Sequence, residues 1–337
     1  MSKEHIAEAL DKFIKDDGFN GSIHIVQNGE AVLSKGYGYS VIEHKILNTA
    51  NTKFGIGSIS KSFTALLILI CEEKNLLSTD DLIIKYFKEA PTEWNSITIQ
   101  QAITHTAGFI HTWECKEFFE KSMTHVSYRD AIDFLKPHPL LNKPGAEFHY
   151  SGLGYFILTY IIEELLEISY EEAIQKYILT PLEMRDSGCG DYRKVLNNHA
   201  SGYAIVRNAV MHDDHVFLPI LMGGGNLYST VEDLAKYDVG LNNKTLISDV
   251  SYKKIYNAVK NNYAYGWYVE LKNDREMIYH GGNLPGFNNF ILRIPSEKTS
   301  IIALSNLNRG IRKKEVFRVS RNVSFDLLEI MDNLQRK

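Results

Sequence analysis

Residues 54–77 read FGIGSISKSFTALLILICEEKNLL, and we expect the rest of the chain to be arranged around them. The two glycines ahead of the first serine give the backbone the freedom of a turn. The segment then reads as a helix, and between Ala65 and Cys71 it is apolar on every side. A helix that is apolar all round belongs in the core of a sizeable domain. We therefore expect Ser58 to stand where a loop becomes a buried helix.

Lys61 follows Ser58 by three residues, so a helix places the two side chains on one face, one turn apart. The free N–H groups and the dipole at a helix N-terminus surround such a serine with positive potential. Partial burial disfavours the charged ammonium and lowers the pKa of Lys61 toward the range in which it accepts a proton. This pairing is typical of an activated nucleophile. A second pair at this spacing, Ser251 and Lys254, lacks the glycine turn, and we interpret it as part of a surface helix.

The composition is that of a globular protein, with 337 residues, of which 44% are hydrophobic and 23% charged. A net charge of −4 argues against a nucleic-acid surface and against a polybasic membrane patch. The three cysteines, at positions 71, 115 and 189, lack the spacing of a zinc site or a disulfide framework. We therefore expect no cofactor, no metal and no nucleic-acid partner.

The first residues, MSKEHIAE, lack the apolar segment of a secretory signal. No run of the chain reaches the ~18 apolar residues that are needed to span a bilayer. These two observations predict a cytoplasmic protein without a membrane span. An exported mature form, from which a signal has been removed, would begin in the same way.

The hydrophobic periodicity changes twice along the chain. Two strands flank Asn28-Gly29, a dipeptide typical of a tight hairpin. A helical pattern then begins near residue 58, and strands return after residue 263. Thr230 is predicted to cap the helix that follows it, with Asp233 closing a capping box. The predicted helices cover residues 3–16, 59–77, 82–87, 98–104, 128–135, 152–166, 170–178, 231–237 and 313–334, and the predicted strands cover 22–26, 31–35, 264–271, 276–280, 288–294 and 300–304.

Strands near both chain ends with helices between them predict an α+β fold. Residues 1–57 and 225–337 are expected to form a mixed domain, in which an antiparallel sheet is flanked by the N- and C-terminal helices. Residues 58–224 are expected to form a mainly helical region inserted between the two halves. Ser58 then lies at the seam, and clefts occur preferentially at such boundaries.

Two further stretches are expected to reach this seam. Tyr150 precedes a predicted helix, and His280 ends a predicted strand. A serine–lysine pair needs a second group that protonates the leaving group. The charges of Lys61 and of a protonated His280 are expected to lower the pKa of the Tyr150 phenol from ~10 toward ~7.

The residues that follow His280 suggest how a substrate is held. Gly281 and Gly282 would let a substrate backbone lie close to the strand. The backbone N–H of Asn283 would pair with that of Ser58 to form an oxyanion hole.

Three motifs in this order, Ser58-Ile-Ser-Lys61, Tyr150-Ser-Gly152 and His280-Gly-Gly282, resemble those of the serine β-lactamase and penicillin-binding protein superfamily. The match is closest to its class C-like branch, which includes D-amino-acid-directed peptidases and carboxylesterases. The resemblance spans about residues 20–305. Supporting phrases are ITHTAG (103–108), PG (144–145), GGNLYSTVEDL (224–234), YGW (265–267) and GNLPGF (282–287).

The resemblance implies a β-lactamase/transpeptidase-like fold and a role for each motif. It makes Ser58 the acylated nucleophile, Lys61 the adjacent base and Tyr150 the proton shuttle. Tyr228 and Phe287 are candidate substrate-binding residues, although packing is an equally good interpretation of both. His105, in the first supporting phrase, is interpreted as structural.

Two positions depart from the family pattern. Gly152 stands where the second motif usually ends in asparagine, so one contact to a substrate amide is missing. His280 stands where the β-lactamases have lysine, which makes the cationic anchor for a substrate carboxylate weaker and pH-dependent. Both departures argue against efficient β-lactam hydrolysis, and they leave esterase and peptidase chemistry open.

The leading hypothesis is a serine hydrolase that forms an acyl-enzyme on an ester or on a D-residue peptide or amide. Its substrate would be a small molecule or a short peptide. One alternative is a β-lactamase, or a penicillin-binding protein that traps the acyl group with little turnover. A lower alternative is a metallohydrolase that uses His212 and His215, which flank two aspartates. The sequence specifies no oligomeric state.

Overall fold

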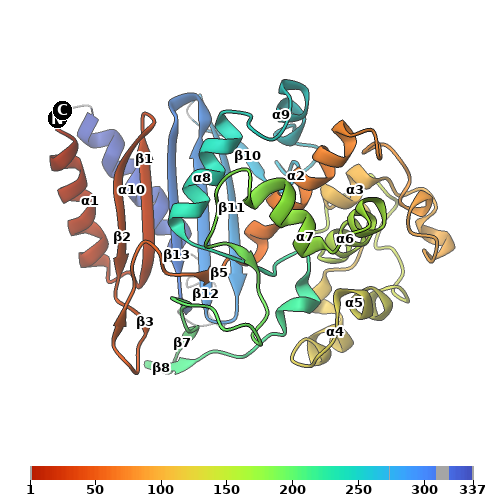
Figure 1. The fold of residues 1–337 in the computed structure, drawn as a ribbon, viewed down its shortest axis with the longest axis horizontal. Helices are drawn as coiled ribbons and strands as arrows, with labels where there is room; N and C mark the ends of the chain where they lie inside the picture. Colours follow the sequence, from red (N-terminus) through yellow and green to blue (C-terminus); the bar gives the residue numbers. More distant parts are fainter. Residues whose placement is uncertain (1, 273, 309–318, 336–337) are drawn as a thin grey trace.

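The centre of the molecule is a six-stranded antiparallel sheet (Figure 1). The computed structural model describes residues 2–272, 274–308 and 319–335. The strand order β10-β11-β12-β13-β1-β2 places two strands from the start of the chain beside four from its C-terminal part, which confirms the predicted sheet. Its strands are β1 (Gly21–Gln27), β2 (Glu30–Tyr37), β10 (Tyr268–Lys272), β11 (Arg275–Leu284), β12 (Phe287–Ile294) and β13 (Thr299–Ser305).

The turns of this sheet explain its register. Asn28 and Gly29 both have positive φ, 54° and 84°, as the tight turn between β1 and β2 requires. A second two-residue turn joins β11 to β12, and across it Leu284 pairs with Phe287. Because pairing begins directly at this turn, β11 continues to Leu284. His280 therefore lies inside a strand, and the prediction that it ends one was wrong.

The two terminal helices cover one face of the sheet. Helices α1 (Lys3–Asp17) and α10 (Val319–Gln335) lie side by side, and apolar residues of both pack against the sheet (Figure 1). Leu10 of α1 and Leu327 of α10 are fully buried there. The predicted terminal helices are therefore present, although residues 313–318 of the second prediction lie outside the described residues.

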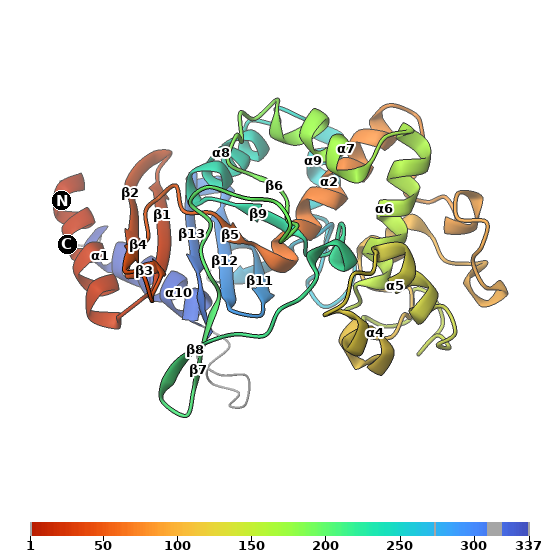
Figure 2. The same ribbon diagram turned by 60° about the horizontal axis from the view of Figure 1, so that its bottom comes forward.

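The other face of the sheet contacts α8, and the remaining helices gather beyond β11 (Figures 1 and 2). In the described part of the chain, no helix has both the length and the apolar composition that crossing a bilayer requires. These helices are α2 (Ser60–Glu73), α3 (Ile99–Ile103), α4 (Lys116–Lys121), α5 (Tyr128–Leu135), α6 (Leu153–Leu166), α7 (Tyr170–Ile174, continued by a π-turn over Gln175–Leu179), α8 (Val231–Asn242) and α9 (Asp249–Ile255).

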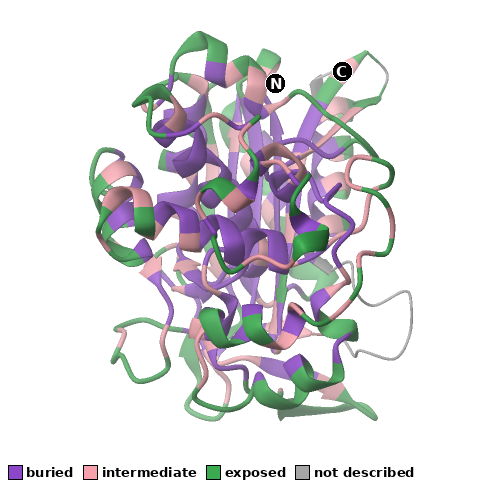
Figure 3. Ribbon diagram, turned by 90° about the vertical axis from the view of Figure 1, so that its right-hand side faces the viewer, coloured by how far each residue is buried: buried purple, intermediate pink, exposed green. Residues whose placement is uncertain are grey.

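Helix α2 is the most deeply buried of these helices, and every residue from Ser60 to Cys71 is inside the protein. Buried residues gather along the sheet and its neighbouring helices, whereas the outer faces are exposed (Figure 3). The buried polar side chains of α2 make local hydrogen bonds. One example is the bond that Ser62 Oγ donates to the carbonyl oxygen of Ile59 at 2.8 Å. The prediction of a helix that is buried all round is confirmed.

Three local predictions were wrong. Residues 82–87 form only a short 3₁₀ turn, Ile83–Lys85, and no side chain caps it. Asp233 does not close a capping box, because its carboxylate instead accepts hydrogen bonds from Asp186 N at 2.7 Å and Ser187 Oγ at 2.9 Å. In α9, Ser251 is buried rather than exposed.

Short strands and 3₁₀ turns complete the structure. Strands β5 and β9 pair beside the start of α2, where Ile56 N donates to Leu227 O at 2.8 Å. The short strands are β3 (Tyr39–Val41), β4 (Ile46–Leu47), β5 (Phe54–Gly55), β6 (Gly188–Cys189), β7 (Tyr203–Val206), β8 (Ala209–His212), β9 (Leu227–Ser229) and β14 (Leu307–Asn308). The other 3₁₀ turns are η1 (Gly57–Ile59), η3 (Thr92–Trp94), η4 (Thr112–Glu114), η6 (Leu218–Leu221) and η7 (Pro295–Glu297).

A buried ion pair joins the sheet to α8. Arg293 of β12 has no exposed side-chain surface, and its Nε lies 2.5 Å from Oδ1 of Asp238, whose side chain is 5% exposed. The same guanidinium donates to Asn242 Oδ1 at 2.8 Å and to the Tyr256 hydroxyl. A buried charge that loses its partner keeps its desolvation cost without the compensating attraction.

Replacing Asp238 by alanine is therefore expected to destabilise the fold by about 3–5 kcal/mol, because the guanidinium of Arg293 stays buried and unpaired. Chemical denaturation measures this loss. The control is Lys12→Ala, which removes an exposed ion pair with Asp16 and is expected to change stability by less than about 1 kcal/mol. Equal stabilities of the two variants would contradict the prediction.

Candidate active site

Ser58 lies in η1, the turn directly before α2, and this turn packs on β11. Gly57 has φ +53°, and a Cβ built on it would lie 2.8 Å from Asn283 N. A Cβ on Gly282 would lie only 1.9 Å from the carbonyl oxygen of Ile56. Both glycines are therefore required for the close approach of turn and strand. Gly282 is buried against the turn, and the expectation that it lets a substrate approach was wrong.

Lys61 is 3% exposed and lies on the first turn of α2. Its Nζ is 3.1 Å from Ser58 Oγ and 2.6 Å from the carbonyl oxygen of Gly224. Burial lowers the pKa of this amine to about 7. The lone pair of the neutral amine can therefore accept the proton of Ser58 near neutral pH.

Tyr150 stands just before α6 and lines the same cleft as Ser58. Lys61 Nζ lies 4.9 Å from the centroid of its ring. Burial raises the pKa of the Tyr150 phenol, and its interaction with the Ser58 hydroxyl only partly opposes this shift. The expected lowering of this pKa is therefore wrong, and the resting residue is a neutral phenol.

His280 is 2% exposed, and its ring centroid lies 6.5 Å from that of Tyr150. Its Nδ1 is 2.6 Å from the carbonyl oxygen of Gly281, and its Nε2 is 3.1 Å from the Tyr263 hydroxyl. Burial, assisted by the charge of Lys61, lowers the pKa of His280 to about 3. The ring is neutral at physiological pH, so the expectation of a protonated, pH-dependent anchor was wrong.

The register of β11 sets the direction of the Asn283 N–H. Leu284 and Phe287 flank a two-residue turn and form a hydrogen-bonded pair, so the preceding residue, Asn283, directs its N–H away from β12. The closeness of Gly57 to this nitrogen places the turn of Ser58 on that side of the strand. The arrangement is suited to an oxyanion hole formed by the N–H groups of Ser58 and Asn283.

A small cleft of about 50 Å³ opens beside these groups. Segments far apart in the chain meet in it: the start of α2, η4, the start of α6, the glycine run before β9, and β11. Its lining residues are Ser58, Lys61, His111, Thr112, Trp113, Tyr150, Gly152, Phe156, Leu221, Gly224, Gly225, Asn283 and Leu284.

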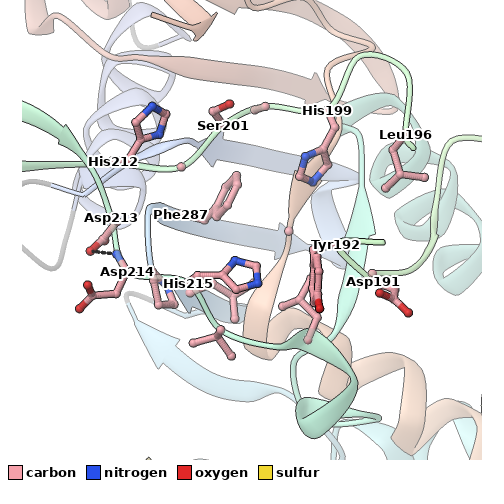
Figure 4. Close-up of a pocket in the computed structure, with 18 of the residues that line it drawn as sticks. Asp191, Tyr192, Leu196, His199, Ser201, His212, Asp213, Asp214, His215 and Phe287 are labelled. Carbon is pink, nitrogen blue, oxygen red and sulfur yellow. Dashed lines mark hydrogen bonds between the residues drawn. The ribbon is translucent and has the colours of Figure 1, made fainter. Parts of the chain in front are cut away.

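A larger cavity of about 430 Å³ adjoins this cleft, and Leu284 lines both. Phe287, His199, His215 and Tyr192 present rings in it, as Figure 4 shows. Phe287 therefore lines the cavity beside the cleft.

The two remaining substrate-binding candidates lie elsewhere. Tyr228 is half-buried in β9, where its hydroxyl lies against Gly188, and it lines neither of the two cavities. Gly281 faces a separate cavity of about 420 Å³, which Arg321 of α10 also lines.

The stretch with two histidines and two aspartates lies on the wall of the larger cavity. His212 Nε2 is 3.4 Å from Glu43. Asp213 Oδ2 accepts hydrogen bonds from Gly286 N at 2.5 Å and from Asn308 Nδ2 at 3.2 Å. Among the described residues, no group of three or more histidine, cysteine, aspartate or glutamate side chains is arranged to hold a metal.

His105 makes the contacts of a structural residue, but the group it supports is Tyr150. Its carbonyl oxygen accepts from His149 N at 2.8 Å, and its Nδ1 accepts from Ser151 N at 3.2 Å. The centroids of the His105 and Tyr150 rings lie 4.2 Å apart. His105 therefore holds the backbone on both sides of Tyr150. Burial, with the charge of Lys61, lowers the pKa of His105, which keeps it neutral.

Residues at the start of η4, and the one before it, were missed by the sequence analysis. His111, Thr112 and Trp113 all line the cleft, yet they follow no periodic pattern and lie outside the three motifs. The only signal close to them is the ITHTAG phrase, which ends three residues earlier.

The Beta-lactamase family model matches residues 6–318, and the chain belongs to this family, as the three motifs predicted. It is 29% identical over 310 residues to the putative penicillin-binding protein PbpX of Bacillus subtilis (strain 168), covering 92% of this chain and 76% of that protein. It is 28% identical over 319 residues to Protein flp of Staphylococcus aureus (strain MW2), covering 89% of this chain but only 63% of that protein.

A solved structure shares the fold over nearly the whole chain. The D-amino acid amidase of Ochrobactrum anthropi SV3, complexed with L-phenylalanine amide, superposes with a TM-score of 0.84 at 20% identity. The match covers 98% of this chain and 99% of the amidase.

Replacing His105 by alanine is expected to slow the reaction of Ser58 with a fluorophosphonate roughly tenfold or more, because Ser151 N loses its acceptor and Tyr150 its support. His105→Asn should retain most of the rate, since asparagine tolerates the φ of +57° at this position and its Oδ1 can replace Nδ1. The rate of reaction with a fluorophosphonate measures both. Equal rates in the two variants, at equal melting temperatures, would contradict this role.

Proposed function

We propose that this protein is a serine hydrolase that acts through an acyl-enzyme on an ester or on a D-residue peptide or amide. The observation that carries the proposal is the 3.1 Å contact between Ser58 Oγ and the buried Nζ of Lys61. Membership of the Beta-lactamase family supports hydrolase chemistry in general. The names of two similar proteins, a penicillin-binding protein and a D-amino acid amidase, point to carbonyl substrates.

In the proposed acylation, Ser58 Oγ attacks the substrate carbonyl carbon and its proton passes to the neutral amine of Lys61. The negative charge that develops on the carbonyl oxygen is stabilised by the N–H groups of Ser58 and Asn283. The bond to the leaving group then breaks. The leaving group takes the Tyr150 proton, and Lys61 returns the first proton to that phenol.

Deacylation repeats these transfers with water as the nucleophile. Water loses a proton through Tyr150 to Lys61, and Ser58 Oγ recovers a proton as the acyl bond breaks. A phenol with a raised pKa suits a relay that gives one proton while taking another, and it is a poor standing phenolate base. Tyr150 is therefore proposed as a relay between Lys61 and the substrate.

The lack of a cation at His280 favours neutral esters and amides over β-lactams that carry a carboxylate. His280 has a pKa of about 3, so it offers no cation to a substrate carboxylate at neutral pH. The 430 Å³ cavity beside the cleft leaves room for an acyl substituent larger than a short alkyl chain. An acyl-trapping protein with little turnover is the second candidate, motivated by the absence of a side chain at Gly152.

The decisive test is intact mass after exposure to a fluorophosphonate. Wild type is expected to gain one adduct, and Ser58→Ala none, because only an activated serine reacts. Turnover of p-nitrophenyl esters, D-aminoacyl anilides and nitrocefin then separates the substrate classes. An adduct without turnover would favour the acyl-trapping alternative, and ester hydrolysis at full rate by Ser58→Ala would end the proposal.

The rate of acylation is expected to rise with pH through about 7, since Lys61 accepts the serine proton only above the pKa of its buried amine. Below that pH the ammonium form predominates and the rate falls. His280→Gln is the matched control, because His280 is already neutral across this range. Stopped-flow acylation over a pH series measures the midpoint, and loss of the pH-dependent rise in His280→Gln would contradict its assignment to Lys61.

A further inference from the structure

The hydroxyl of Thr112 fills the space beside Gly152. Gly152 N donates to Thr112 Oγ1 at 2.7 Å, and a Cβ built on Gly152 would lie 2.7 Å from the same oxygen. Thr112 is 2% exposed, yet it lines the cleft together with Ser58 and Asn283. A side chain at position 152 and the Thr112 hydroxyl therefore exclude each other. Packing against Thr112 therefore explains why position 152 is a glycine. The cleft still contains a polar group at this place, the Thr112 hydroxyl, which another segment of the chain supplies.

This hydroxyl has an unused donor. A threonine hydroxyl can donate one hydrogen bond and accept two. Among the described residues, Thr112 Oγ1 accepts from Gly152 N and donates to none. The cleft residues Phe156, Leu221 and Trp113 present apolar side chains, and they offer the proton no acceptor. An acceptor on a bound substrate would satisfy it.

The walls of the cleft suggest where that acceptor lies. The edge of β11 with Asn283 N borders the cleft on one side, and η4 with Thr112 contributes another part of its lining. A substrate whose scissile carbonyl is bound by Asn283 N occupies the space between them. The acyl half stays attached to Ser58 through both chemical steps, so a contact with that half acts throughout the reaction.

We propose that Thr112 Oγ–H donates to a second carbonyl oxygen in the acyl half of the substrate, and so selects acylamino substrates over simple alkanoyl esters. This inference rests on the proposed function. It assigns to Thr112 a contact with substrate, and it narrows the substrate class to esters or amides of N-acylated amino acids. A site that hydrogen-bonds a substrate group discriminates against analogues without that group, because its own polar atom is then left unpaired.

The test compares two esters with one leaving group, the p-nitrophenyl esters of N-acetyl-D-alanine and of propionic acid. Thr112→Val, which keeps the shape and removes the hydroxyl, is expected to lose roughly tenfold in kcat/KM on the acylamino ester and less than about threefold on the propionate. Thr112→Ser restores the hydroxyl and should recover the wild-type preference. Gly152→Ala, whose methyl group displaces the hydroxyl, should show the same selective loss as Thr112→Val.

The outcomes separate this inference from the proposed function. Equal losses on both esters would assign Thr112 a purely structural role through Gly152, and wild-type rates in Thr112→Val and Gly152→Ala would exclude the contact. Either result overturns the inference and leaves the hydrolase standing. A wild-type protein that hydrolyses neither ester and gains no fluorophosphonate adduct overturns both.

Discussion

The close contact between the turn of Ser58 and strand β11 is the constraint that brings Ser58 and Asn283 to one cleft. It is a contact of main chain with main chain, possible only because Gly57 and Gly282 lack a Cβ. Main chain has no rotamers to choose among, so the fold determines how the main chain of the Ser58 turn lies relative to Asn283 N. The same contact joins the helical elements to the sheet, and it thereby forms one wall of the cleft.

Burial of a lysine without a carboxylate partner sets the electrostatics of this site. The hydrogen bonds of Lys61 are to Ser58 Oγ and to the carbonyl oxygen of Gly224, neither of which carries a formal charge. Desolvation therefore lowers the pKa of the amine. His280 and His105, close to it and also buried, have lowered pKa values as well. The two histidines are therefore neutral, and Lys61 is the member of this group whose charge changes near neutral pH.

The position of Tyr150 is also determined by the residues packed around it. Its backbone is held on both sides by His105, and its ring contacts the ring of that histidine. A proton relay must keep its hydroxyl within hydrogen-bond reach of donor and acceptor alike, so the phenol has to be held in one orientation. The turn η4 supplies the neighbouring wall, and there Thr112 occupies the volume that Gly152 leaves empty. Two segments distant in the chain thus line one cleft side by side.

The local sequence was sufficient for the main helices and strands and for the closeness of Ser58 and Lys61. Apolar residues on every side of 65–71 predicted a buried helix, Asn28-Gly29 predicted the hairpin, and the three-residue spacing of Ser58 and Lys61 predicted their proximity. These properties depend on neighbours within a few residues of one another. The charge state of His280, the packing role of Gly282 and the place of Thr112 in the cleft depended on the tertiary structure. Burial and close approach are properties of what packs against a residue, and those partners are separated from it by tens to hundreds of positions in the chain.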